Sequence, residues 1–230
     1  MRFVLLHSPL LGPSSWRAVA AALHAAGHTA EAAAWPRLSS VSSDFYRTLA
    51  DSLAGGLPQT GEPPLLVAHS GAGALIPALS ARLGHVSGVV FCDAILPHPG
   101  QSWFDTAPAE MRAHLRSGAE DGRLPAWDQW WPPGALDRLV PDDCLRERLL
   151  AELEPLPVDY FEEPAPEAAY DGPQAYLRLS GAYETEAMLA GRQGWPVVRL
   201  PLNHLAILTQ PDAVAAAVAS LAAALPPSGK

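Results

Sequence analysis

Three side chains of types that cooperate in nucleophilic catalysis stand far apart in the sequence: Ser70, Asp93 and His204. A serine hydroxyl is a weak nucleophile at neutral pH, and it needs a general base such as an imidazole within hydrogen-bond reach. The imidazole in turn needs a carboxylate that fixes its tautomer and orientation. Together these residue types predict acyl transfer through a covalent serine intermediate, if the fold brings them together.

The residues around Ser70 indicate how its hydroxyl would be presented. An apolar run at 65–68 precedes this serine, and the small residues 71–73 follow it. A buried strand that turns directly into a helix has room only for small side chains, and it exposes the turn residue in the geometry called a nucleophile elbow. A serine at such a turn can instead be only a helix N-cap. The small residues beside Ser70 and the presence of His204 favour a nucleophile over an N-cap serine.

The positions of the base and the acid follow from the ends of predicted strands. His204 lies in the loop after the last predicted strand, which favours it as general base. Asp93 directly follows the strand predicted after that of Ser70. Glu184 follows a later strand and either supplies the acid or begins a helix, where a carboxylate complements the helix dipole. We favour Asp93 over Glu184.

The elements that must position these side chains alternate along the chain. Strands are predicted at 3–6, 29–33, 65–68, 88–92, 176–179 and 197–200, and helices at 43–55, 71–83, 185–193 and 211–225, with an alanine-rich helix ending near Gly27. Alternating strands and helices predict a parallel sheet with helices on both faces, a three-layer α/β sandwich. Ligands of such sheets bind beyond the carboxyl ends of the strands, where all three side chains fall.

The alternation breaks in the middle of the chain. Residues 97–173 are rich in proline, tryptophan and acidic residues, with short helical patterns at 108–116 and 142–153. We therefore predict one core made of 1–96 and 174–230 and an inserted helical cap at 97–173, called the cap segment below.

The chain order of Ser70, an acid and then His204, with the serine between strand and helix, resembles the α/β-hydrolase superfamily. The likeness covers almost the whole chain. Residues 7–9 match the superfamily's His-Gly segment, and Trp16 and the helix led by Pro211 are similar to its methylesterase and hydroxynitrile lyase branch. The resemblance implies an α/β-hydrolase fold and a catalytic triad that works without a cofactor or a metal.

The oxyanion site departs from the pattern that this resemblance implies. Relatives hold the oxyanion with two backbone N–H groups, and Gly71 supplies the first. The second position is Pro9, which has no N–H group. Loss of one such donor costs about 2.7–4 kcal/mol. Either the Leu10 N–H or the Ser8 hydroxyl replaces it, or the reaction develops less charge on oxygen.

Composition and charge exclude several classes of partner. The 230 residues carry 15 Lys and Arg against 24 Asp and Glu, a net charge of -9, which argues against nucleic acid and anionic membranes. No apolar segment reaches the length of a membrane span. The two cysteines, Cys92 and Cys144, form neither a disulfide framework nor a metal-binding spacing. With no signal peptide recognised at its N-terminus, we predict a cytoplasmic protein.

The cap segment is also rich in aromatic residues. We expect most of them to form its own core, and a subset facing Ser70 would imply an apolar or aromatic acyl substrate. The aromatic residues considered are Trp103, Trp127, Trp130, Trp131, Tyr160 and Phe161.

The leading hypothesis is a cofactor-independent serine hydrolase that acts on a small ester, thioester or lactone through an acyl-enzyme on Ser70. A lyase, cyclase or isomerase is an alternative in which His204 and Asp93 only move protons, and Pro9 motivates it. A non-catalytic protein that binds a small ligand is the third. All three take a small-molecule partner, and a homodimer is possible in each case.

Overall fold

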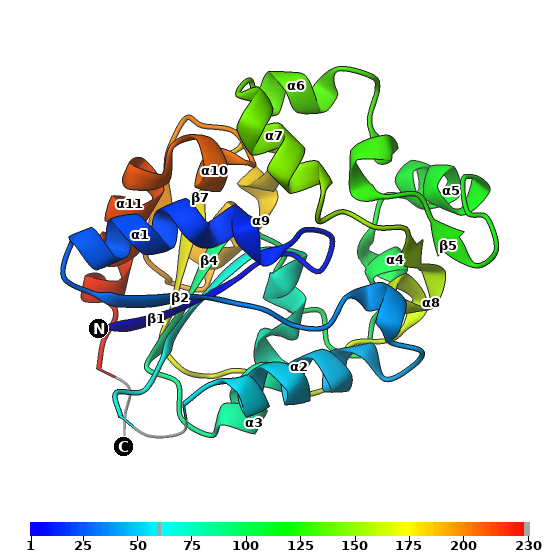
Figure 1. The fold of residues 1–230 in the computed structure, drawn as a ribbon. Coiled ribbons are helices and arrows are strands. Elements are labelled where there is room, and N and C mark those ends of the chain that lie inside the picture. Colours follow the sequence, from blue (N-terminus) through cyan, green and yellow to red (C-terminus); the bar gives the residue numbers. More distant parts are fainter. Residues whose placement is uncertain (59–60, 228–230) are drawn as a thin grey trace.

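A six-stranded parallel sheet forms the centre of the computed structural model, which describes residues 1–58 and 61–227 (Figure 1). Its strands are β1 (Arg2–Leu6), β2 (Thr29–Ala33), β3 (Leu65–Ser70), β4 (Gly88–Ala94), β7 (Gln174–Arg178) and β8 (Val197–Arg199). Their order is β2-β1-β3-β4-β7-β8, and all neighbouring pairs are parallel. The predicted three-layer α/β sandwich is confirmed.

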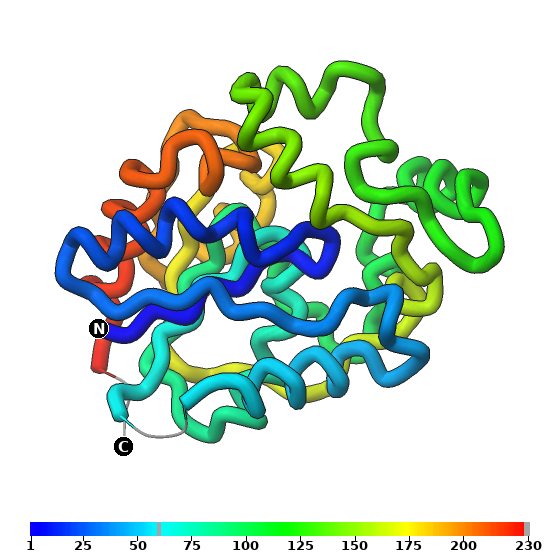
Figure 2. The backbone as a smooth tube through the Cα atoms, viewed as in Figure 1, coloured from blue at the N-terminus to red at the C-terminus, as the bar shows by residue number. Residues whose placement is uncertain are grey.

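Side chains alternate between the two faces of the sheet, as a strand period of two requires. In β1, Phe3 and Leu5 pack in one hydrophobic cluster, whereas Val4 and Leu6 pack in the other. Figure 2 shows helices on both sides of the strands. The first face is covered by α1 (Arg17–Ala25) and α11 (Pro211–Ala224), and the second by α2 (Phe45–Gly56), α3 (Ile76–Leu83) and α9 (Glu184–Arg192).

The chain between β4 and β7 forms short elements outside this sheet. They are α4 (Trp103–Thr106), α5 (Ala109–Ser117), β5 (Arg123–Leu124), α6 (Ala135–Leu139), α7 (Asp143–Leu150), β6 (Leu156–Pro157) and α8 (Val158–Glu162). Strands β5 and β6 pair antiparallel. A two-residue strand has no periodicity to detect, so neither was predicted. A further short helix, α10 (Ala206–Thr209), follows β8.

Hydrogen bonds attach the cap segment to loops that follow the sheet strands. Ser14 Oγ, after β1, donates to Glu152 at 2.6 Å. The Phe45 N–H, after β2, donates to Glu163 at 2.8 Å. Because these loops leave the carboxyl ends of the strands, the cap segment lies over that edge of the sheet, as the green elements of Figure 1 show.

Most aromatic residues of the cap segment are buried. Trp127 and Trp130 are each 8% exposed, Tyr160 4% and Phe161 0%, whereas Trp131 is 39% exposed. Their rings contact one another, so they stabilise the segment itself.

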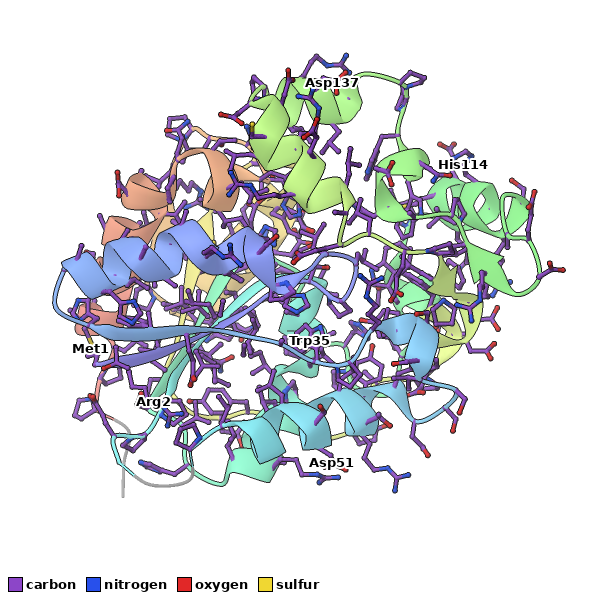
Figure 3. All side chains as sticks on the ribbon, in the orientation of Figure 1. Met1, Arg2, Trp35, Asp51, His114 and Asp137 are labelled. Atoms are coloured by element: carbon purple, nitrogen blue, oxygen red, sulfur yellow. The ribbon has the colours of Figure 1, made fainter. Side chains whose placement is uncertain are left out.

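Several polar side chains lie exposed on the outer surface. In Figure 3, Asp51, His114 and Asp137 extend from their helices into solvent, whereas Trp35 points inward and its ring centroid lies 4.6 Å from that of His7. No helix in the described part of the chain is long and apolar enough to cross a membrane.

Several element boundaries differ from the prediction, and two of these differences affect the site. Strand β4 continues to Ala94, so Asp93 lies within its end instead of after it. The helix predicted at 71–83 begins with a 3-10 helix, Gly71–Leu75, before α3. The backbone at Gly73 approaches Ile95 so closely that an added Cβ would lie 1.9 Å from its carbonyl oxygen. Ile95 directly follows the neighbouring strand β4, and this close contact lies in the 3-10 turn that precedes α3.

Candidate active site

Ser70 occupies a strained turn at the end of β3. Its φ of 55° and ψ of -127° lie in a region that side chains rarely adopt. A Cβ added at Gly71 would lie 3.3 Å from Ser8 Oγ, so this turn has little space for a larger residue. The serine is 8% exposed. Such strain is typical of a nucleophile elbow.

The end of β4 places Asp93 beside this turn. The pairing of β3 with β4 shifts register after His69, so that Ser70 lies opposite Ala94 and Asp93 is left out of the ladder. The φ of Asp93 is 45°. Aspartate is one of the few side chains that tolerate this region. The shift directs a fully buried carboxylate toward the loops after β7 and β8.

Four hydrogen bonds hold the Asp93 carboxylate. Oδ1 accepts from the N–H groups of Leu179 at 2.8 Å and Ser180 at 2.9 Å. Oδ2 accepts from Ser180 Oγ at 2.7 Å and from His204 Nδ1 at 2.8 Å. Burial raises the pKa of Asp93, but the hydrogen bonds from His204 and Ser180 outweigh it and hold that pKa below its usual value. The group is therefore a carboxylate at neutral pH.

Glu184, the alternative acid of the sequence analysis, lies elsewhere. Its carboxylate pairs with Arg178 Nε and with Arg199, each at 2.9 Å. Among the described residues, the carboxylate that contacts His204 is that of Asp93.

Two aromatic rings stack on the imidazole of His204. The His69 ring lies 4.5 Å away at 27°, and the Tyr183 ring lies 4.9 Å away at 10°. His69 Nε2 also donates to the His204 carbonyl oxygen at 2.9 Å. Burial lowers the pKa of His69 to about 3, so this ring is neutral beneath the imidazole. These contacts and Asp93 fix the orientation of His204.

Ser70 Oγ forms its hydrogen bond with the hydroxyl of Tyr183, at 3.3 Å. Among the described residues it has no such bond with His204. Tyr183 was not among the site residues predicted from the sequence. The available signal was its place in the polar loop after the strand at 176–179, where only carboxylates were considered.

The oxyanion donors expected from the sequence lie at Gly71 and in the turn after β1, where Ser8 Oγ would be 3.3 Å from a Cβ added at Gly71. Ser8 follows β1 and is fully buried. The Leu10 N–H, one of the two expected replacements for Pro9, donates to Ser8 Oγ at 3.2 Å. Because a hydroxyl can accept one bond while it donates another, the Ser8 proton stays available for a ligand near Gly71.

In the part of the chain that the structure describes, no group of three or more His, Cys, Asp or Glu side chains is arranged to hold a metal ion. The site combines a strained serine, an imidazole oriented by a carboxylate, the Tyr183 hydroxyl next to the serine and the Ser8 hydroxyl near Gly71. This set of groups can carry out nucleophilic acyl transfer or proton transfer.

The sequence profile of the alpha/beta hydrolase family matches residues 3–217. No curated protein sequence matches the chain.

Several solved structures share the fold. An extracellular alpha/beta-hydrolase from a Paenibacillus species superposes with a TM-score of 0.76 at 20% identity, covering 96% of this chain and 98% of that chain. A pyrethroid hydrolase from Sphingobium faniae JZ-2 gives a TM-score of 0.70 at 21% identity, covering 97% and 98%. Polyneuridine aldehyde esterase gives 0.71 at 19% identity, covering 96% and 98%. At these identities the likeness shows the fold.

Proposed function

Because the chain belongs to the alpha/beta hydrolase family, we propose that it is a serine hydrolase that cleaves a small ester, thioester or lactone without a cofactor. The observation that carries this proposal is the 2.8 Å hydrogen bond from His204 Nδ1 to the buried Asp93, beside the strained turn at Ser70. In this proposal Ser70 is the nucleophile, His204 the general base and Asp93 the acid that orients the imidazole.

The reaction proceeds in two halves. Ser70 Oγ attacks the carbonyl carbon while its proton passes to His204 Nε2, and Asp93 stabilises the resulting imidazolium. The imidazolium then protonates the leaving group, which departs and leaves an acyl-enzyme. Water, deprotonated by His204, attacks the acyl carbon and releases the acid. The hydrogen bond between Ser70 and His204 forms when substrate binds, since catalytic hydrogen bonds are often long or poorly aligned in unliganded enzymes.

The Ser8 hydroxyl and the Gly71 N–H are the oxyanion donors in this proposal. The Leu10 N–H already donates to Ser8 Oγ, which supports the hydroxyl rather than the Leu10 amide as the replacement for Pro9. The Leu10 amide instead orients the hydroxyl.

The cap segment, residues 97–173, closes the site in this proposal and favours an apolar or aromatic acyl group. Its Trp127 ring lies 6.5 Å from that of His204. Two of the similar structures are named a pyrethroid hydrolase and an esterase, which supports an ester substrate. A cytoplasmic location stays a prediction that cell fractionation can test. A homodimer likewise stays a prediction, and light scattering can test it.

A fluorophosphonate probe tests the proposed function directly. We expect it to label the wild-type protein and Ser52→Ala, whose serine is exposed on α2, but not Ser70→Ala. Wild-type protein that stays unlabelled and inert on short acyl esters would show that it is not a serine hydrolase.

Proton-transfer chemistry without an acyl-enzyme is the second candidate, and the missing N–H of Pro9 favours it. A lyase, cyclase or isomerase of this kind would keep its activity in Ser70→Ala. Its product would also carry no oxygen from labelled water.

A further inference from the structure

We infer that Tyr183 is a further catalytic residue of this site, which donates a hydrogen bond to Ser70 Oγ in the unliganded protein and to the leaving-group oxygen during ester cleavage. The inference rests on the proposed function, because it concerns the same acyl transfer. It adds a hydroxyl donor on the leaving-group side of the nucleophile.

Tyr183 contacts the nucleophile and the base together. Its hydroxyl lies 3.3 Å from Ser70 Oγ. Its ring stacks on His204 at a centroid distance of 4.9 Å and an angle of 10°. Tyr183 is the last residue of the short 3-10 helix Gly181–Tyr183. The N-cap residue of this helix, Ser180, donates its backbone N–H to the Asp93 carboxylate. The carboxylate that orients the base therefore also anchors the loop that carries this tyrosine.

The direction of the hydrogen bond follows from chemistry. Burial raises the pKa of the Tyr183 phenol, so it keeps its proton at neutral pH. Ser70 must give its own proton to His204 when it attacks. The Ser70 oxygen therefore accepts, and the Tyr183 hydroxyl donates.

The sheet order separates Tyr183 from the oxyanion donors. Ser8 follows β1, which borders β3 on one side, whereas Tyr183 follows β7, beyond β4 on the other side. Tyr183 therefore shares the side of Ser70 on which His204 delivers a proton to the leaving group. In the tetrahedral intermediate, Ser70 Oγ and the leaving-group oxygen are bonded to the same carbon. A donor that reaches the first oxygen is thus within reach of the second.

No proton is transferred from Tyr183 in this scheme. The proton that ends on the leaving group comes from Ser70 through His204, and the phenol only stabilises the charge that develops on the departing oxygen. The effect must therefore grow with the charge on that oxygen, and so with the pKa of the leaving alcohol.

The test compares esters of one acid that differ in leaving group. In Tyr183→Phe the ring stack is kept and only the hydroxyl is removed. We expect kcat/KM to fall about 10- to 100-fold for an alkyl ester. For the nitrophenyl ester, whose alcohol departs without help, we expect a change below about 3-fold.

Tyr170→Phe is the matched control. The Tyr170 hydroxyl is buried, and among the described residues it has no hydrogen-bond partner. Removing this hydroxyl should leave kcat/KM unchanged for both esters. Equal losses for the two esters in Tyr183→Phe would indicate a structural role and overturn the inference, as would no loss for either. Melting curves of both variants check that the fold is kept.

Fluorophosphonate labelling separates this inference from the proposed function. If wild-type Ser70 is not labelled, the proposed function itself fails. If the wild type and Tyr183→Phe are both labelled, but kcat/KM changes by the same factor for both esters in the variant, only the role of Tyr183 fails.

Discussion

At the scale of single residues, strain and hydrogen bonding meet at the same positions. Ser70 and Asp93 both have positive φ, a conformation that costs free energy for residues other than glycine. The four hydrogen bonds of Asp93 offset that cost and hold His204 in one orientation. Such outliers cluster at functional sites. Of the four described residues other than glycine with positive φ, Ser70 and Asp93 belong to the proposed triad, whereas Asp44 and Asp121 lie outside it.

Asp93→Asn tests the orienting role of the carboxylate. Asparagine tolerates the same positive φ, so the fold should be kept. The charge that fixes the His204 tautomer is lost, so kcat should fall by about 10³- to 10⁴-fold. Glu184→Gln is the matched control, because Glu184 pairs with arginines away from His204. Steady-state ester hydrolysis is the measurement, and equal losses in both variants would contradict the assignment.

Ser8→Ala tests the replacement for the donor that Pro9 lacks. If the Ser8 hydroxyl holds the oxyanion, kcat should fall by about 10²-fold with little change in KM. The control is Ser15→Ala, since Ser15 is also fully buried but donates to the Gly12 carbonyl oxygen. An unchanged kcat in Ser8→Ala would return the role to the Leu10 amide.

From residue types and positions, the sequence predicted Ser70, His204 and Asp93, favoured over Glu184, as a triad, and the structure places Asp93 within hydrogen-bond distance of His204. Tyr183 was missed although it lies in the polar loop after the strand predicted at 176–179. Its contact with Ser70, at the end of β3, joins segments that are far apart in the sequence, and no local pattern records it.

At the scale of elements, the turn from β3 into α3 determines the position of the nucleophile. Gly73 is required there because the Ile95 carbonyl oxygen occupies the place of any Cβ. Short apolar runs such as 65–68 predicted the strands. The 3-10 first turn and the two extra residues of β4 depend instead on this contact between elements and on the register shift after His69.

Gly73→Ala should therefore destabilise the protein, by about 3 kcal/mol, because a backbone segment must move to admit the methyl group. Gly55→Ala provides the contrast. Gly55 lies in α2 with nothing within 4 Å of its added Cβ, so alanine should stabilise the protein by about 0.5–1 kcal/mol. Urea unfolding measures both, and a Gly73→Ala protein as stable as the wild type would contradict the packing described.

At the scale of the whole molecule, the parallel sheet brings loops from distant parts of the chain to one edge. That arrangement follows from the alternation of strands and helices, which is why the fold could be predicted. The positions of the cap segment's elements could not, because short helices and two-residue strands have weak local signals and are held by contacts such as that of Glu163 with the Phe45 N–H.

The stability of the whole molecule should fall in mild acid. Burial lowers the pKa of His7 to about 4 and that of His69 to about 3, against about 6.5 in the unfolded chain. The unfolded state therefore binds more protons between pH 6.5 and 4, so stability present above pH 6.5 is lost as the pH falls. Each histidine contributes about 1 kcal/mol per pH unit in this range. The raised pKa of the half-buried Glu186 has the opposite sign and offsets part of the loss.

Urea unfolding at several pH values between 7 and 4.5 measures this slope. His7→Asn should make it shallower, because asparagine does not titrate. His114→Asn, at an exposed position on α5, should leave it unchanged. A wild-type stability that is flat over this range would contradict the burial of neutral histidines.

The proposed hydrolase requires that Ser70 forms a covalent bond with the acyl group of the substrate. Rapid acid quenching during turnover of a nitrophenyl ester, followed by mass spectrometry of the protein and its peptides, tests it most directly. We expect one added acyl group on the peptide that contains Ser70, and none in Ser70→Ala. Ester turnover with no acylated protein, or with the acyl group on another residue, would contradict it.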